Sequence, residues 1–235
     1  MGTDVGAAQE RSAAIARVIS LRVGLPQEYM TPRSAGTADH VWSSGIRKEP
    51  VEGPRWLTST GFEGDGQGDL VAHGGIEQAV LLIGMGTYRF WDATLGAGVL
   101  QPGTFGENLL LDDLDEATAC VGDVYAVGDA LLEVSNPRKP CWKLARHTSM
   151  PQLPRQVTAS GRGGWYVRVL QEGNVASGDE LRLEMRPFPE WTIERINAVR
   201  YGREAEPQSR AALARCPALS RRWRDWFARD VIDPD

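Results

Sequence analysis

The segment at residues 135–147, SNPRKPCWKLARH, has the residue types and spacing of a reactive cysteine site. Pro137 and Pro140 limit the continuation of a strand, and Pro140 also favours the first turn of a helix. Cys141 is therefore expected at a helix N-terminus, where free backbone N–H groups favour a negative charge. The segment contains no acid, and four cations surround the cysteine: Arg138, Lys139, Lys143 and Arg146.

Cations beside a thiol at a helix start lower the pKa of that thiol and favour the thiolate. A thiolate attacks electrophiles or ligates a metal, so Cys141 is the candidate catalytic and metal-ligating residue. The same cations suit phosphate or another compact oxyanion, and a metal held by Cys141 together with an organic anion would explain the positive charge. No second Cys or His stands at zinc-ligand spacing, which argues against a metal cage made only by the protein. The alternative is that Cys141 is a small buried core residue beside a solvated basic face.

The two other cysteines are expected to be structural. Cys120 lies at a strand start close to several acids, and Cys216 precedes a proline between two helices. Three widely spaced cysteines form neither a disulfide framework nor a C-x-x-C zinc site, so the expected compartment is a reducing cytoplasm.

Two loops offer further candidates. The segment at residues 61–75 is rich in glycine, which allows the backbone to approach a ligand closely, and it matches neither a P-loop nor a dinucleotide fingerprint. His73 in this loop is either an acid, base or orienting donor, or a structural hydrogen-bonding residue. Glu107 and Asn108 precede an apolar strand. If buried they need partners such as loop amides, and they are expected to hold the architecture of the site.

The elements that must position these residues are mainly β. The chain has 235 residues, of which 42% are hydrophobic, with 26 Gly and 14 Pro, as in a turn-rich β body with a sizeable core. Residues 26–75 are expected to be irregular with several short strands. A helix capped by Thr87 and ended by Gly96 should bury Tyr88 and Trp91. Apolar patterns predict strands at residues 15–23, 79–83, 124–127, 130–135, 165–170 and 181–185.

The pattern changes after residues 186–189. Three short helices are expected: one from Thr192 to Gly202, one at residues 207–215, and one that starts at Pro217. Such a small unit should dock on the β body through its aromatic residues. The predicted division is therefore a flexible tail at residues 1–13, a β domain at 14–186 and a three-helix domain at 191–235.

Composition excludes several classes of function. The net charge of −5 gives no bulk basic footprint for nucleic acid. The longest apolar run, residues 79–83, is far shorter than the roughly 18 residues of a membrane span, and no signal peptide is visible. A cytoplasmic protein without a membrane or nucleic-acid partner is expected.

Four motifs in this order resemble those of MOSC domain proteins of the YiiM-like group: GDGQ with HGG at residues 64–75, GTFGENL at 103–109, GD at 122–123, and PRKPCWKL at 137–144. The resemblance implies a β-barrel-like MOSC domain with short peripheral helices, followed by a small three-helix domain. It also implies that the molybdenum cofactor (Mo-molybdopterin) binds here with Cys141 as the metal ligand. Members of the family reduce N-hydroxylated compounds such as hydroxylaminopurines and amidoximes with electrons from a separate redox protein.

The resemblance also suggests which residues contact the cofactor. Lys48, in the segment GIRKEPV, is similar to a family segment that faces the pterin phosphate. The full set of predicted cofactor contacts is Lys48, His73, Gly74, Asn108, Asn136, Arg138, Lys139 and Lys143, with Cys141 and His73 as catalytic residues.

Two other functions stay open at this point. The chain could be a non-catalytic carrier of the cofactor or of a persulfide on Cys141. It could also be a thiol hydrolase that pairs Cys141 with His147 or His73, although a histidine six residues away lies on another helix face unless the helix breaks.

Overall fold

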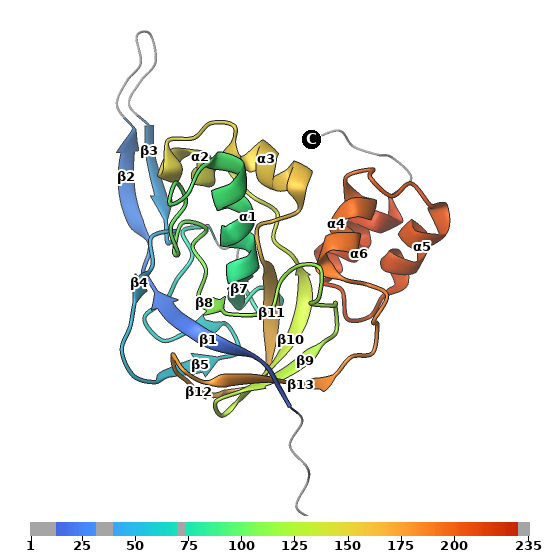
Figure 1. Ribbon diagram of the computed structural model, residues 1–235, viewed down its shortest axis with the longest axis horizontal. Coiled ribbons are helices and arrows are strands. Elements are labelled where there is room, and N and C mark those ends of the chain that lie inside the picture. Colours follow the sequence, from blue (N-terminus) through green and yellow to red (C-terminus); the bar gives the residue numbers. More distant parts are fainter. Residues whose placement is uncertain (1–12, 32–39, 70–73, 230–235) are drawn as a thin grey trace, which may run out of the picture.

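The apolar runs of the chain close into a barrel with a helical unit beside it (Figure 1). The computed structural model describes residues 13–31, 40–69 and 74–229. His73 and, except for residue 13, the predicted tail lie outside these ranges. The barrel strands are β1 (Ala14–Val23), β7 (Val80–Gly84), β8 (Leu109–Leu111), β9 (Val124–Val127), β10 (Ala130–Pro137), β11 (Trp165–Gln171) and β13 (Glu180–Met185).

Strand pairing closes the barrel completely. The order is β13-β9-β10-β11-β7-β8-β1, and β1 pairs back with β13 through the register Arg17↔Glu180. All these pairs are antiparallel except β7 and β8, which run parallel with Leu82 opposite Leu109. Closure satisfies the backbone groups that an open sheet would expose at its edges. The predicted mainly β, barrel-like fold is confirmed.

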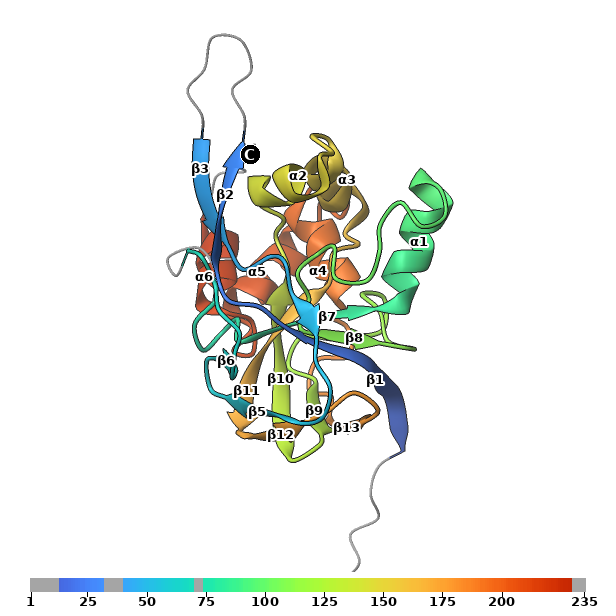
Figure 2. The ribbon, with the colours of Figure 1, turned by 90° about the vertical axis from the view of Figure 1, so that its left-hand side faces the viewer.

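Smaller elements cover one end and one side of the barrel (Figure 2). β2 (Gln27–Thr31) and β3 (His40–Ser44) form a hairpin, and β4 (Glu49–Pro50) pairs antiparallel with the end of β1. A three-stranded sheet contains β5 (Arg55–Thr58), β6 (Gly61–Phe62) and β12 (Gly173–Val175). The helices α1 (Met85–Leu95), α2 (Trp142–Thr148) and α3 (Leu153–Ser160) lie at the same end as the hairpin. This end carries the candidate site.

The C-terminal helices are α4 (Ile193–Arg200), α5 (Pro207–Arg215) and α6 (Arg221–Ala228). As predicted, Thr192 caps the first of them: its hydroxyl accepts a hydrogen bond of 3.1 Å from the Arg195 amide. The helices share a core with Val121 of the barrel body, and the Ser220 amide donates to the Ser135 carbonyl at 2.9 Å. The helical unit is therefore docked on β10 by packing and by backbone pairing.

Three local expectations were wrong. α1 begins after Gly84, and Thr87 is buried inside the helix, where its hydroxyl donates to Glu116 at 2.8 Å. α6 begins after Ser220 rather than at Pro217. β10 continues to Pro137, which lies opposite Trp165, with a register shift between Val134 and Asn136. Proline can end the strand because it has no backbone N–H that must be paired.

The close approach at Gly84 gives a stability prediction. A Cβ at this position would lie 1.5 Å from the Leu114 carbonyl oxygen, so Gly84→Ala forces the backbone apart. We expect a loss of about 3 kcal/mol in unfolding free energy and a drop in Tm of roughly 6–12 °C, measured by thermal and urea denaturation.

Gly86→Ala is the matched control. A Cβ at Gly86 would first meet the Asp115 carboxylate oxygen at 3.3 Å, and alanine favours the α1 helix by up to about 1 kcal/mol over glycine. This variant should melt at the wild-type temperature or above. Equal melting temperatures for the two variants would contradict the packing argument.

In the described part of the chain, no helix combines the length and apolar character that a bilayer crossing requires.

Candidate functional site

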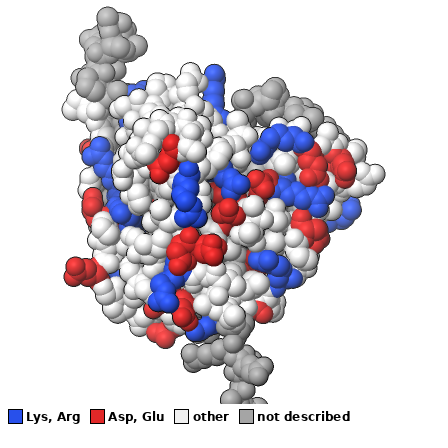
Figure 3. All heavy atoms as spheres, viewed as in Figure 1, with Lys and Arg blue, Asp and Glu red and all other residues white. Residues whose placement is uncertain are grey.

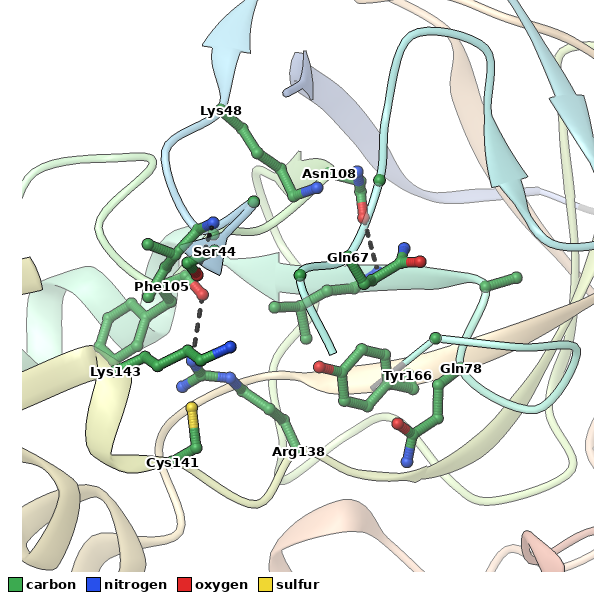
Figure 4. Close-up of a pocket in the computed structure, with 18 residues that line it drawn as sticks. Ser44, Lys48, Gln67, Gln78, Phe105, Asn108, Arg138, Cys141, Lys143 and Tyr166 are labelled. Carbon is green, nitrogen blue, oxygen red and sulfur yellow. Dashed lines mark hydrogen bonds between the residues drawn. The ribbon is translucent and has the colours of Figure 1, made fainter. Parts of the chain in front are cut away.

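A cavity of about 80 Å³ lies at the helix-covered end of the barrel, under α2 (Figure 4). Five chain segments meet there: the turn after β3, the glycine-rich loop, the start of β7, the turn before β8, and the β10–α2 junction with β11 beside it. The residues that line it are Ser44, Gly45, Ile46, Lys48, Gly66, Gln67, Gly68, Gly74, Gln78, Ala79, Leu81, Phe105, Gly106, Asn108, Arg138, Cys141, Lys143 and Tyr166.

Cys141 is the N-cap residue of α2, as the proline pattern predicted. Its carbonyl accepts a hydrogen bond from Leu144, and β10 is fixed just upstream because the Arg138 amide donates to Gly164 at 3.0 Å. The side chain is half-buried and borders the cavity. The alternative of a fully buried core cysteine is therefore wrong for Cys141.

Arg138 offers the cavity an unpaired buried donor. Its side chain is 7% exposed, its Nη2 donates to the Phe105 carbonyl at 3.2 Å, and its guanidinium lies 5.7 Å from the Phe105 ring centroid. Among the residues that the structure describes, its buried Nη1 has no hydrogen-bond partner within 3.5 Å. Figure 4 shows the Cys141 sulfur directed toward this guanidinium. Because an unsatisfied buried donor is costly, the arrangement favours an anionic or acceptor ligand in the cavity.

A buried ion pair forms another wall. The Lys48 ammonium contacts the Asp65 carboxylate, and the side chains are 5% and 1% exposed. Asp65 also accepts hydrogen bonds of 2.9 Å from the Gly24 amide and from the Asn108 side chain. Burial lowers the pKa of Lys48, and the Asp65 charge opposes this shift. The pair keeps a cation at the cavity wall.

Asn108 holds loops together, as its predicted architectural role requires. Its Oδ1 accepts from the Leu81 amide at 3.1 Å, while its Nδ2 donates to Asp65 and to the Arg22 carbonyl. The neighbouring Glu107 is fully buried and accepts from the Gly103 amide and the Tyr88 hydroxyl. A loop amide is thus one of its partners, as expected.

Tyr166 is a cavity residue that the sequence did not single out. Its neighbours Trp165 and Val167 point into the barrel core, so the alternation of β11 places Tyr166 on the outer face. Burial raises the pKa of Tyr166, with the Arg138 charge acting in the opposite direction. The phenol is therefore protonated at neutral pH. The sequence does not show that Tyr166 borders the cavity, because this depends on loops that pack over the outer face of β11.

Glycines at the cavity let the backbones of its loops approach one another closely. A Cβ on Gly45 would lie 2.1 Å from the Gly66 carbonyl oxygen, and Gly106 has a positive φ of 74°. Side chains at these two positions would push apart the loops that form the cavity.

Two predicted contact residues lie elsewhere. Asn136 is fully buried, and its amide donates to the Pro137 carbonyl at 2.8 Å, outside the cavity lining. Lys139 is exposed and lines a separate groove. Among the described residues, the structure therefore brings Lys48, Gly74, Asn108, Arg138 and Lys143 around Cys141.

The other reactive side chains are not placed for a shared site with Cys141. His147 does not line the cavity, and its pKa is lowered by burial and by the nearby Arg47 charge. Cys120 and Cys216 are buried, and burial raises the pKa of the Cys120 thiol to about 11. Within the described ranges, no three His, Cys, Asp or Glu side chains gather as a metal cage. Among the described residues, Cys141 is thus not part of a ready-made set of three metal ligands.

The chain matches known proteins over both of its parts. The family description "MOSC domain" matches residues 69–182, and "YiiM-like, 3-alpha helix domain" matches residues 191–229. The uncharacterized protein YflK of Bacillus subtilis is 35% identical over 214 residues, covering 90% of this chain and 93% of that protein. A Gibberella moniliformis protein named Reductase is 36% identical over 180 residues, which are 75% of this chain and 31% of that protein. The crystal structure of YiiM from Geobacillus stearothermophilus has a TM-score of 0.71 at 31% identity and covers 90% of this chain and 97% of its own.

Proposed function

The chain belongs to the MOSC domain proteins of the YiiM-like group. On this premise we propose that it is an oxidoreductase that reduces N-hydroxylated compounds. In this proposal the protein holds the molybdenum cofactor through Cys141. One observation carries the proposal: a half-buried thiol and an unpaired buried guanidinium nitrogen face the same cavity. A relative named Reductase supports redox chemistry for this group of sequences.

The residues present fit the cofactor in kind. A thiolate is a soft ligand that suits such a metal, and Lys48, Arg138 and Lys143 supply positive charge for a pterin phosphate. The volume of about 80 Å³ admits one end of such a group rather than the whole pterin. When bound, the cofactor supplies a metal centre that can take up and release two electrons.

The protein's own residues then bind the substrate and move protons. The reaction is R–NHOH + 2 e⁻ + 2 H⁺ → R–NH₂ + H₂O, so two protons must reach the N–O group. The Tyr166 hydroxyl holds a proton at neutral pH, because burial raises the pKa of this phenol, and it lines the cavity. Arg138 Nη1 offers a hydrogen bond to the oxygen that leaves or to an anion beside it.

The test of this proposal is elemental analysis combined with an activity assay. Protein purified from a host that makes the cofactor should contain stoichiometric molybdenum and pterin. It should reduce N-hydroxyadenine with dithionite-reduced methyl viologen as the electron donor. Stoichiometric cofactor without turnover of any N-hydroxylated compound would instead identify a carrier, and protein without molybdenum would refute the proposal.

The exposed indole of Trp142 follows Cys141 in the chain, outside the residues that line the cavity, and we propose that aromatic substrates stack on it. Trp142 is 49% exposed, and its ring packs edge-on against Trp42 with the centroids 5.7 Å apart. Stacking of a base on an aromatic side chain contributes roughly 1–3 kcal/mol. We expect Trp142→Ala to raise KM for a hydroxylaminopurine at least about 5-fold, measured by steady-state kinetics with the viologen donor.

Two comparisons separate stacking from a general defect. Trp142→Phe keeps an aromatic face and should recover most of the loss. An aliphatic amidoxime has no ring to stack, so its KM should change little in Trp142→Ala. Equal losses for both substrate types would show that Trp142 does not select aromatic rings.

A further inference from the structure

A second cavity lies between the barrel domain and the C-terminal helices. This groove measures about 1100 Å³ and runs between α3 and the α4–α6 unit. Pocket sizes for small molecules are typically about 300–1000 Å³, so the groove is large for a small ligand. Its lining is Lys139, Pro140, Pro154, Arg155, Thr158, Ala159, Val199, Arg200, Tyr201, Gly202, Arg203, Glu204, Ala205, Glu206, Pro207, Arg210 and Trp226.

The groove is basic in a protein that is acidic as a whole. Five cations line it against two carboxylates, Glu204 and Glu206, whereas the chain carries a net charge of −5. Glu204 is itself bound to Arg195 at 3.0 Å. Arg155 and Arg203 are exposed and make no ion pair within the described part of the chain. Basic side chains alternate with acidic ones over the C-terminal helices in Figure 3.

An indole and two guanidinium groups stack in the groove. The Arg200 guanidinium lies 4.2 Å from the Trp226 ring centroid, and that of Arg210 lies 4.7 Å from it. Arg210 also donates to the Trp226 carbonyl at 3.1 Å. These contacts fix two of the cations, so a partner would lose less side-chain entropy when it binds them.

One short segment separates the groove from the candidate site. Lys139 and Pro140 line the groove, while Arg138 and Cys141 on either side of them line the cavity under α2. A molecule seated in the groove therefore contacts the residue that precedes Cys141.

We propose that this groove is the docking surface for an acidic one-electron carrier protein that reduces the site. The inference rests on the proposed function. These 235 residues hold three cysteines, one fewer than a cysteine-ligated iron–sulfur cluster uses, and the proposal therefore takes the electrons from a separate carrier protein. The balance is R–NHOH + 2 reduced carriers + 2 H⁺ → R–NH₂ + H₂O + 2 oxidised carriers. The acidic chain as a whole repels nucleic acid, and the local positive charge attracts an acidic protein surface.

The test uses the double variant Arg155→Glu/Arg203→Glu in the full-length protein. The probe is a plant-type [2Fe–2S] ferredoxin, an acidic one-electron carrier. We expect its Kd to rise about 10-fold or more and its salt dependence to weaken, because rim charges govern encounter. The ferredoxin-driven rate should fall in parallel, and the viologen-driven rate should stay at the wild-type value. Arg89→Glu, an exposed change on α1 outside the groove lining, is the matched control and should alter neither.

The outcomes separate the two proposals. Unchanged ferredoxin binding and unchanged ferredoxin-driven rate in the double variant would overturn the docking surface. Wild-type protein that binds no ferredoxin, or a groove that binds inorganic phosphate or single-stranded DNA in its place, would also overturn it. Failure of viologen-driven turnover would refute the proposed function but not the docking surface. The ferredoxin Kd is measured without turnover, so it still tests whether the groove binds the carrier.

Discussion

Cys141→Ser is expected to remove bound molybdenum and reductase activity together. A serine hydroxyl stays protonated at neutral pH, so the variant loses the soft anionic ligand at the cavity wall. Changes outside the first ligand shell of a metal site already reduce affinity or activity roughly 10- to 100-fold, so the loss of the ligand itself should exceed that range. The measurements are the molybdenum content per chain and the viologen-driven rate with N-hydroxyadenine.

Cys120→Ser provides the matched control. The Cys120 sulfur is buried 3.5 Å from the Pro189 carbonyl oxygen, to which a serine hydroxyl can also donate. Burial raises the pKa of this thiol to about 11, so it contributes almost no thiolate at neutral pH. The control should keep both metal and activity. Full molybdenum content in folded Cys141→Ser protein would show that the cofactor is held elsewhere.

The sequence predicted helix ends correctly where prolines or capping residues close to the helix start determine them. The limits of α5 (Pro207–Arg215) agree with the structure because a proline starts the helix, and the Thr192 cap agrees because its partner is three residues away. The place of Cys141 at the start of α2 depends in the same way on the adjacent Pro140.

The errors arise where distant residues decide the outcome. Thr87 could cap a helix, but Glu116, 29 residues away, accepts its hydroxyl instead, and the helix starts earlier. Asp65 was not singled out as a site residue, because nothing near it in the sequence shows that Lys48 and Asn108 converge on it. Arg138 and Lys139 are adjacent cations of one motif, yet they line different cavities because neighbouring side chains point apart.

The second large effect concerns the buried Lys48–Asp65 pair. Asp65→Asn removes the charge that compensates a buried ammonium and disturbs the hydrogen bonds from Gly24 and Asn108. Breaking a buried pair by removing one partner typically costs about 3–5 kcal/mol, which we expect as the loss in unfolding free energy at neutral pH. Lys48→Met should cost less, because Asp65 keeps two N–H donors, while cofactor retention should fall. Asp113→Asn, at an exposed carboxyl, is the control and should leave stability unchanged.

The pH dependence distinguishes an uncompensated charge from a simple packing defect. Burial already lowers the pKa of Lys48 from 10.5, and Asp65 is the main group that opposes this shift. In Asp65→Asn the native pKa of Lys48 therefore falls further, and between that value and 10.5 the unfolded chain binds more protons than the native state. The unfolding free energy of the variant consequently rises with pH in this window, and its deficit relative to wild type shrinks between the native pKa of Lys48 in the variant and that in wild type. Urea denaturation at a series of pH values measures this effect, and Lys48→Met/Asp65→Asn, which lacks the ammonium, should not show it. A deficit in Asp65→Asn that is constant from neutral pH upward would show that lost hydrogen bonds, and not the buried charge, cause the instability.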